Sequence, residues 1–500
     1  MTKQQRLVLM VAILASFVVF LDGAIVNVAL PAIQRQLGGG LAAQQWIVDA
    51  YLLTLGSLIL IAGSLSDLLG RKRILTVGLA GFGIASLLCA VAPNSNLLII
   101  FRAIQGIAGA LLVPSSLAMI IAAFSGPAQG KAIGSWTAWT GISFLIGPLL
   151  GGILVDQASW RWIFAINVLP IVVTLYLLKD VEVGAEVRPK TAVDFVGTVL
   201  CALGLGGPVF ALIEQSRYGW SDPLIYLPLV VGVILFAGFL WYEARAHHPM
   251  LPLSLFGNRN FSVGNVATLA IYAGLGTSTF LIVLFLQQVG GYSAFAAGLA
   301  LLPVTLLMFV LSSRFGALSG KYGPRFFMGV GPLVAGCGFL LMLRLHADVQ
   351  YWSQLFPGII LFGVGLSITV APLTAAILGD VPKPQAGIAS AVNNAVARIA
   401  GLVAIAAVGA IVAAQFSSGL AHDMRGFSIP TSAVKTAQQA SLQVTPPAPY
   451  QRDVAFRSAL SNASVSAFHR GILVVTLLIA SGGIVSAIGI KNPKRQSIKS

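Results

Sequence analysis

The feature that most constrains this chain is a series of long apolar segments that recurs along almost its whole length. A helix needs about 20 apolar residues to cross the hydrocarbon layer of a bilayer. Segments of this length are centred near residues 20, 55, 84, 109, 143, 170, 204, 234, 275, 304, 335, 366, 400 and 479. Only 9% of the residues are charged, against about 25% in soluble domains. The sequence therefore predicts an all-α polytopic membrane protein with fourteen transmembrane helices.

The cations of the chain are distributed unevenly between alternate loops. A formal net charge of +15 would suggest a nucleic-acid partner in a soluble protein, but in a membrane protein Lys and Arg first report orientation. With an even number of spans and a cytoplasmic N-terminus, the inner loops and the tail hold most of the cations. The outer loops hold only scattered ones, such as Arg35, Arg161 and Arg217. We therefore expect both termini in the cytoplasm, the lipid bilayer as the main partner and no nucleic acid.

Cysteine and histidine residues give no sign of a disulfide or a metal site. Cys89, Cys201 and Cys337 fall in separate apolar segments, far apart in the sequence. His247 and His248 are adjacent and have no third ligand nearby. We expect no bound metal and no organic cofactor.

An internal repeat indicates the architecture. The segment from Gly63 to Gly70 aligns without gaps on the segment from Gly316 to Gly323, and each joins the second and third helices of a six-helix set. Two six-helix halves that face one another are the plan of many secondary transporters, with the substrate path between them. The two remaining helices are predicted to form a hairpin inserted between the halves.

This repeat predicts the domain boundaries. The expected parts are an N-terminal six-helix bundle over 1–180, a linker with the inserted hairpin over 181–258, a C-terminal bundle over 259–490 and a tail over 491–500. The second bundle includes a long outer segment, 416–467, rich in Ser, Ala, Gln and Pro. We expect a mobile loop there rather than a domain. Its last part, with Phe456 and Phe468, is either an amphipathic helix at the interface or an ordered lead-in to the last span.

Asp22 lies deep in the first apolar segment, near the expected middle of the membrane. An ionised carboxylate at that depth costs at least ~2.5–3.5 kcal/mol and is normally functional. Such a group can load and release a proton and thereby couple transport to a proton gradient. The alternative is an Asp22 that is satisfied by the backbone or by a polar neighbour such as Asn27.

Arg102 and Asp49 are further charges inside predicted helices. A buried guanidinium needs an acidic or multi-acceptor partner, and Asp22 is the nearest acid by depth. We predict an interaction between Arg102 and Asp22, direct or through water, although structural packing alone is the alternative. Asp49, near the outer end of the second helix, is either a second titrating site or a solvated carboxylate at a helix end. Glu214 and Arg398 are additional candidates for buried charges.

The fifth predicted helix is rich in glycine. Without side chains at these positions, a neighbouring helix can approach closely, and a proline among them adds a point where the helix can kink. The residues of this group are Gly141, Gly147, Pro148, Gly151 and Gly152. Ordinary packing of small residues is the alternative interpretation.

Aromatic and polar residues in several helices suggest a substrate cavity, because aromatic rings can stack on cationic or planar compounds. Some of them are expected to face lipid instead. The candidate cavity residues are Phe20, Asn27, Gln105, Trp136, Trp139, Asn393 and Arg398.

Five patterns, in the order of the expected helices, resemble those of the major facilitator superfamily, in its branch of fourteen-helix drug:proton antiporters. They lie in the segments 21–31, 63–73, 101–109, 141–152 and 160–170, and the resemblance covers nearly the whole chain. It implies the major facilitator fold. It also implies a role of Arg102 in proton transfer, and a seal formed by the glycines of 141–152 that distinguishes exchangers from uptake systems.

The resemblance further implies a conformational latch on the cytoplasmic side, formed by the turn after the second helix. Its residues are Gly63, Asp67, Gly70, Arg71 and Arg73. We expect Asp67 to meet the N-terminal end of the thirteenth helix, around 385–387. The second copy of the turn has Gly320 in place of this acid, and Leu68 stands where many relatives have a cation.

The expected function is proton-coupled efflux of amphipathic, cationic or multidrug-like compounds across the inner membrane, by alternating access, with a role in antibiotic resistance. Protons are the coupling ion, and a monomer is expected. No phosphate-binding loop and no arrangement of nucleophile and base appears in the sequence, so we expect a secondary transporter and not an enzyme. The alternatives are a transporter of one metabolite or lipid-like molecule on the same scaffold, and a membrane receptor that transports nothing.

Overall fold

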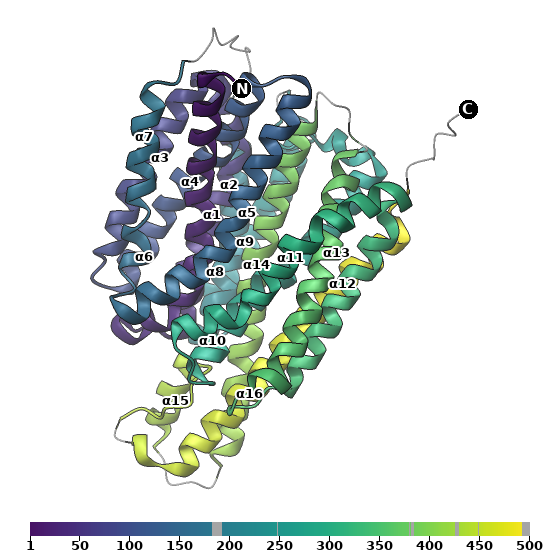
Figure 1. Cartoon of the computed structure of the whole chain (residues 1–500). Helices are drawn as coiled ribbons and strands as arrows, with labels where there is room; N and C mark the ends of the chain where they lie inside the picture. The colour runs from purple at the N-terminus through teal and green to yellow at the C-terminus, as the bar shows by residue number, and fades with distance from the viewer. Residues whose placement is uncertain are drawn as a thin grey trace. The chain divides into compact units, whose positions relative to one another are not determined.

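A computed structural model describes residues 1–182, 193–247, 249–379, 381, 385–425, 430–448 and 450–492 (Figure 1). All of the regular structure in these ranges is helical. The first nine helices are α1 (Lys3–Leu37), α2 (Gly40–Leu69), α3 (Arg71–Ala90), α4 (Ser95–Ala123), α5 (Gly126–Gln157), α6 (Trp162–Ala165), α7 (Val168–Lys179), α8 (Phe195–Tyr218) and α9 (Pro223–Glu243). The others are α10 (Arg259–Gln288), α11 (Ala294–Tyr322), α12 (Pro324–Leu341), α13 (Phe356–Gly379), α14 (Ala386–Asp423), α15 (Thr431–Ala440) and α16 (Val454–Gly489). Short helical turns lie at Leu253–Gly257, Met342–Arg344, Tyr351–Leu355 and Tyr450–Arg452.

The predicted number of spans is confirmed. The described part of the chain has 14 helices that are long and apolar enough to cross a membrane. One of them, Trp162–Lys179, combines α6 and α7, and α15 is not among them. The chain is a multi-pass, all-helical membrane protein.

The two repeated turns have the same backbone conformation. Gly70, between α2 and α3, has a φ of 98°, and Gly323, between α11 and α12, has a φ of 90°. Each amide donates to the carbonyl of the serine four residues earlier, Ser66 at 3.1 Å and Ser319 at 2.8 Å. A side chain is strained at this φ, so glycine is required for the reversal in both places. The repeat seen in the sequence therefore also exists in the geometry of the chain.

Contacts between residues group the chain into two compact units. Unit 1 consists of Met1–Leu251, Thr279–Leu299 and Ile405–Arg470, and unit 2 consists of Pro252–Ser278, Ala300–Ala404 and Gly471–Ser500. These units cut α10, α11, α14 and α16 within their lengths, because part of each helix packs with the first half of the chain. The domain boundaries expected from the repeat differ from these units and stay a prediction.

Within unit 1, polar side chains join the first helices to the later segments. Gln45 of α2 donates to the carbonyl of Ile405 in α14 at 2.7 Å, and Gln288 of α10 donates to Gln34 of α1 at 2.6 Å. Asp156, near the end of α5, accepts from the first two amides of α11, those of Ala294 at 3.1 Å and Phe295 at 2.9 Å. These contacts hold α1, α2 and α5 against parts of α10, α11 and α14.

The predicted hairpin of two additional helices is formed by α8 and α9. A Cβ on Gly204 would lie 2.8 Å from the backbone of Phe236, so the two helices pack with almost no space between them. Glu214 of α8 accepts a hydrogen bond from the indole of Trp46 in α2 at 2.8 Å. Its carboxylate thereby anchors the hairpin to α2.

The expectation of a mobile loop over 416–467 is wrong for most of the residues that the structure describes there. α14 continues to Asp423, α15 occupies Thr431–Ala440, and α16 begins at Val454. Phe456, Leu460 and Phe468 are fully buried, and the ring of Phe468 stacks on Phe285 at 4.1 Å. Ordered lead-in to the last span is therefore the correct interpretation of this part, because its apolar side chains have partners within unit 1.

Unit 2 is built around closely packed glycine contacts and a small polar cluster. A Cβ on Gly338 of α12 would lie 2.6 Å from the carbonyl oxygen of Gly358 in α13. Asn393 of α14 donates to Thr268 of α10 at 2.8 Å and to Asn265 at 3.2 Å.

Candidate functional site

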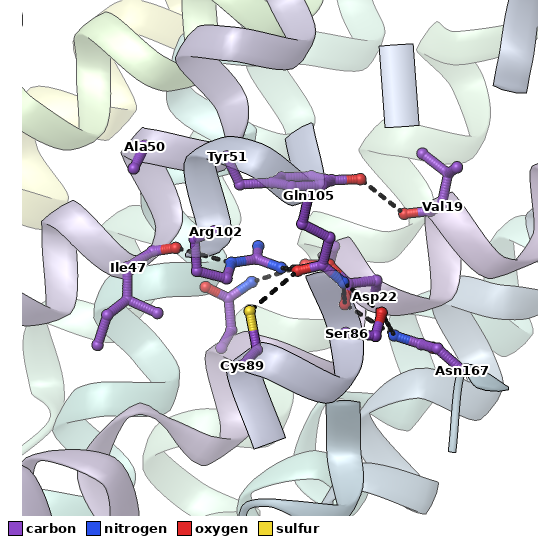
Figure 2. A network of polar contacts seen from close by, with 12 residues as sticks. Val19, Asp22, Ile47, Ala50, Tyr51, Ser86, Cys89, Arg102, Gln105 and Asn167 are labelled. Carbon is purple, nitrogen blue, oxygen red and sulfur yellow. Dashed lines mark hydrogen bonds and ion pairs between the residues drawn. The ribbon is translucent and has the colours of Figure 1, made fainter. Parts of the chain in front are cut away.

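The centre of the site is a buried ion pair between α1 and α4. One guanidinium nitrogen of Arg102 lies 2.5 Å from Oδ2 of Asp22 (Figure 2), and the two side chains are 1% and 0% exposed. The predicted contact between these residues is therefore present, and it is direct. Their role in proton transfer stays a prediction.

The remaining oxygen of Asp22 accepts from two amides. Gln105, one turn after Arg102, donates to Oδ1 at 2.9 Å, and Asn167, between α6 and α7, donates to it at 3.0 Å. The amide of Gln105 also donates to Ser86 of α3 at 2.9 Å, while its carbonyl oxygen accepts from Arg102 at 2.6 Å. Side chains of α4 and of the break between α6 and α7, supported by Ser86 of α3, thus hold the carboxylate of α1 in one position (Figure 2).

The guanidinium of Arg102 is held on its other sides by α2 and by aromatic rings. Its Nε donates to the carbonyl of Ile47 at 3.0 Å. Its central carbon lies 4.2 Å from the centre of the Tyr51 ring and 5.7 Å from that of Phe164. Cation–π contacts of this kind strengthen when water is excluded. The hydroxyl of Tyr51 donates to the carbonyl of Val19 in α1 at 3.3 Å, so that the ring itself is fixed.

This set of residues, Asp22, Ser86, Arg102, Gln105 and Asn167, is here called the Asp22 network. Each side chain in it is at most 1% exposed. A buried charge is tolerated when it is paired and hydrogen-bonded, and both conditions are met. Protonation of Asp22 would remove the charge that Arg102 faces and leave the guanidinium with uncharged acceptors, so one proton can change the stability of the whole network.

Asp49 of α2 is also buried, but it lacks the hydrogen-bond partners that Asp22 has. It is 0% exposed, and neither of its carboxyl oxygens has a hydrogen-bond partner. It lies one turn after Gln45, the residue that contacts α14. Since its side chain is buried, the solvated helix-end interpretation of Asp49 is wrong for this conformation.

The predicted cavity residues are only partly brought together. Gln105 belongs to the Asp22 network, and Asn27 donates to the carbonyl of Gly23 at 3.4 Å and not to Asp22. Trp136 of α5 donates to Ser16 of α1 at 3.0 Å. Trp139 is 51% exposed. Phe20 and Arg398 are partly buried.

Close contacts with neighbouring helices were predicted for four glycines of α5, and three of them have such contacts with two helices. A Cβ on Gly147 would lie 2.7 Å from the Cβ of Ala24 in α1, and Gly151 packs on Ile25. A Cβ on Gly152 would lie 2.7 Å from the amide nitrogen of Phe295. Gly141 has no atom within 4 Å of its Cβ position, so it has no such contact.

Pro148 takes part in the same α5–α11 contact. Its carbonyl oxygen lies 2.6 Å from the Cβ position of Gly298 in α11. Together with Gly152, it brings the backbones of α5 and α11 close to each other. The seal that the family resemblance implies would lie at this contact.

The predicted latch is described only in part. Gly70 has the backbone conformation given above, Gly63 has no atom within 4 Å of its Cβ position, and Arg73 is exposed. The side chain of Asp67 and those of 386–387 lie outside the described part of the structure. The latch, including Arg71, therefore stays a prediction.

Three members of the site were not singled out by sequence reasoning: Tyr51, Ser86 and Cys89. The thiol of Cys89 lies 3.7 Å from Oε1 of Gln105. Asn167 was noticed only as part of a sequence pattern. The sequence pattern does not give the depth of a side chain in the bundle. It is this depth that places Ser86 and Cys89 of α3 at the level of Asp22.

Comparison with known proteins shows which family the chain belongs to. A family model described as Major Facilitator Superfamily matches residues 12–405. The chain is 35% identical to the puromycin resistance protein pur8 of Streptomyces alboniger over 80% of each chain. It is 35% identical to the methylenomycin A resistance protein of Bacillus subtilis over 81% of this chain and 87% of that one. It is 33% identical to the multidrug resistance protein Stp of Mycobacterium tuberculosis over 84% of this chain and 78% of that one.

Solved structures show the same fold at low sequence identity. A bacterial homologue of the human lysosomal transporter Spinster aligns with a TM-score of 0.65 and 15% identity, over 97% of this chain and 98% of the other. A D-xylose–proton symporter aligns with a TM-score of 0.62 and 13% identity, over 98% of both chains. Fourteen candidate spans fit the fourteen-helix drug:proton antiporter branch. The chain belongs to the Major Facilitator Superfamily and is a transporter, not an enzyme.

Proposed function

We propose that this protein exports amphipathic, cationic compounds across the cytoplasmic membrane in exchange for protons. The observation that carries the proposal is the Asp22–Arg102 pair, buried inside a helical bundle where a permanent charge has no structural need. Intramembrane ionisable groups with defined partners are typical of proton relays. The relatives named for resistance to antibiotics or several drugs support export over uptake.

Two carboxyl groups in different environments suggest how coupling works. Asp22 faces a guanidinium at 2.5 Å, whereas both carboxyl oxygens of Asp49 are buried without a donor. Alternating access would expose each group in turn and exchange its proton. Protonation of Asp22 releases Arg102, and deprotonation restores the pair.

The orientation follows from the loop charges. With the N-terminus inside, Arg71, Lys72 and Arg73 lie at the cytoplasmic start of α3, which satisfies the positive-inside rule. We therefore propose cytoplasmic termini. A monomer as the working unit, protons as the coupling ion and no further cofactor belong to the same proposal.

The test uses purified protein in proteoliposomes with an imposed pH gradient. The wild type should move a cationic dye and consume the gradient, and Asp22→Asn and Arg102→Ala should lose at least about tenfold in gradient-driven rate, since coupling needs both charges. Asp222→Asn is the matched control, because Asp222 only caps α9 through the amide of Leu224. Full gradient-driven transport by Arg102→Ala would refute its role in coupling. Competition by one metabolite alone would favour a dedicated transporter on the same scaffold.

A further inference from the structure

A second pair of acids, one partly buried and one buried, lies at the end of the α8–α9 hairpin, apart from the Asp22 network. Asp194 precedes the first residue of α8, and Glu243 is the last residue of α9. Glu243 is 2% exposed. The sequence reasoning did not single out either residue, because each follows or precedes a span and looks like a solvated end.

One oxygen of each carboxyl is satisfied by the backbone. Oδ1 of Asp194 accepts from the amide of Gly197 at 2.8 Å, and Oε2 of Glu243 accepts from the amide of Leu251 at 3.0 Å. The other two oxygens, Oδ2 of Asp194 and Oε1 of Glu243, are buried and have no donor. Both lie within 2.5 Å of the Cβ position of Gly197, so a side chain there would displace them.

The unsatisfied oxygens of the two carboxyls therefore lie close to the same point beside Gly197. A hydrogen bond can join the two side chains once either carries a proton. Two ionised carboxylates in one buried site repel each other, and the stable arrangement has one proton between them. A metal ion such as Ca²⁺ would require about six or more oxygen ligands, and no cluster of three or more His, Cys, Asp or Glu suited to a metal occurs in the described part of the chain.

The charged and titratable neighbours do not replace that proton. The hydroxyl of Tyr242 faces Asp194, and the thiol of Cys201 faces Glu243. Arg245 and His247 line a pocket together with Asp194, but the guanidinium of Arg245 lies over the ring of Trp241 at 4.3 Å. The pocket gives solvent protons a route to Asp194, while Glu243 is buried behind it.

We propose that Asp194 and Glu243 bind one proton between them, which forms a proton site separate from the transport network. The site joins three segments: the start of α8, the end of α9 and the chain at Met250–Leu251 that leads to α10. Its deprotonation places two anions side by side, and their repulsion favours opening of the contact with Leu251, although the hydrogen bond from the Leu251 amide by itself favours the charged carboxylate. The site thus makes the connection between the hairpin and α10 sensitive to pH.

The test measures hydrogen exchange of the amides around Leu251 in the full-length protein in nanodiscs, corrected for the intrinsic pH dependence of exchange. In the wild type, the protection of these amides should fall at least about tenfold as the pH rises and the shared proton is lost. A tenfold change corresponds to a difference of about one unit between the pKa of the site in the closed and in the open form. In Glu243→Gln, the amide NH₂ can donate to Asp194 while the oxygen still accepts from Leu251, so protection should stay high at every pH. Asp22→Asn should keep the wild-type response.

A second measurement detects the proton directly. The wild type should show, besides any band of Asp49, a further infrared C=O band of a protonated carboxyl that is absent from Glu243→Gln and Asp194→Asn but present in Asp22→Asn. The proposal is overturned if wild type and Glu243→Gln share one pH profile of exchange, or if neither variant changes the infrared band. The infrared band is measured in the folded wild type. It therefore tests the proposal even if a variant is too unstable for the exchange experiment.

Discussion

At the residue scale, the Asp22–Arg102 pair was predictable from the sequence, and its surroundings were not. Two opposite charges at similar depth in apolar helices have few other partners, so the pair follows from electrostatics. Asn167 contributes from a break between α6 and α7, and Gln105 looked like a cavity residue. Their roles depend on helix rotation, which the sequence pattern of an almost wholly apolar helix specifies weakly.

The contribution of the Asp22–Arg102 pair to the free energy of unfolding can be measured by a double-mutant cycle. Arg102→Ala leaves Asp22 as an unpaired buried charge and removes the donor to Ile47, so we expect a loss of roughly 3–5 kcal/mol in the free energy of unfolding. The double variant Asp22→Asn with Arg102→Ala should regain part of this loss, because no buried charge remains. Denaturant or thermal unfolding in detergent checks both values. Equal stability of the single and double variants would contradict the pairing.

Asn167 provides a milder perturbation of the same carboxylate. Asn167→Ala removes a donor at 3.0 Å from Asp22 but leaves Arg102 and Gln105 in place. We expect a cost of about 1–3 kcal/mol in stability and slower gradient-driven transport, because the carboxylate loses one of the donors that fix its position. Asn394→Ala is the control, since Asn394 is exposed and donates only to the carbonyl of Ser390 in its own helix. An unchanged rate of gradient-driven transport in Asn167→Ala would exclude it from coupling.

At the element scale, glycine patterns predicted which helix would pack closely but not which glycines would be in contact. Gly147, Gly151 and Gly152 lie on faces that meet α1 and α11, while Gly141 faces open space. The sequence likewise missed α15, because its Ser, Ala and Gln residues resemble a loop, whereas an ordered lead-in to the last span was one of the two interpretations of the start of α16. Burial of Phe456 and Phe468 in unit 1 outweighs that composition.

This difference between glycines gives a matched pair of variants. In Gly152→Ala, the new methyl would lie 2.7 Å from the amide nitrogen of Phe295, so α5 and α11 must separate, at a cost of about 1–3 kcal/mol. Gly141→Ala meets no atom within 4 Å and should be neutral or slightly stabilising, since alanine favours a helix. Unfolding midpoints and dye transport in proteoliposomes check both. Equal effects of the two variants would show that close packing at Gly152 does not matter.

At the scale of the whole molecule, fourteen spans and the two repeated turns followed from the sequence, because segment length and glycine positions are local properties. The grouping of the outer parts of α10, α11, α14 and α16 with the first half of the chain was not predicted. It arises from contacts far apart in sequence, such as Gln45 with Ile405 and Asp156 with the start of α11. In the proposed orientation, these contacts lie on the outer side, and we expect them to keep it closed.

The closed side should therefore open when its polar contacts are removed. Asp156→Ala deprives the first two amides of α11 of their acceptor, and losing a capping acceptor costs about 0.5–2 kcal/mol. That free energy shifts the balance between closed and open conformations several-fold. A cysteine placed at Ala406 reports the shift, because Ala406 is fully buried, and it lies one turn before Gly409, whose Cβ position faces Gln45.

Maleimide labelling of Ala406→Cys should become several-fold faster when Asp156→Ala is added, measured against the parent protein, whose exposed thiol is Cys337. Asp222→Ala is the control, since Asp222 also caps a helix, α9, but makes its hydrogen bond within that helix. It should leave the labelling rate unchanged. If both variants speed labelling equally, general loosening explains the result, and Asp156 is not a specific closing contact.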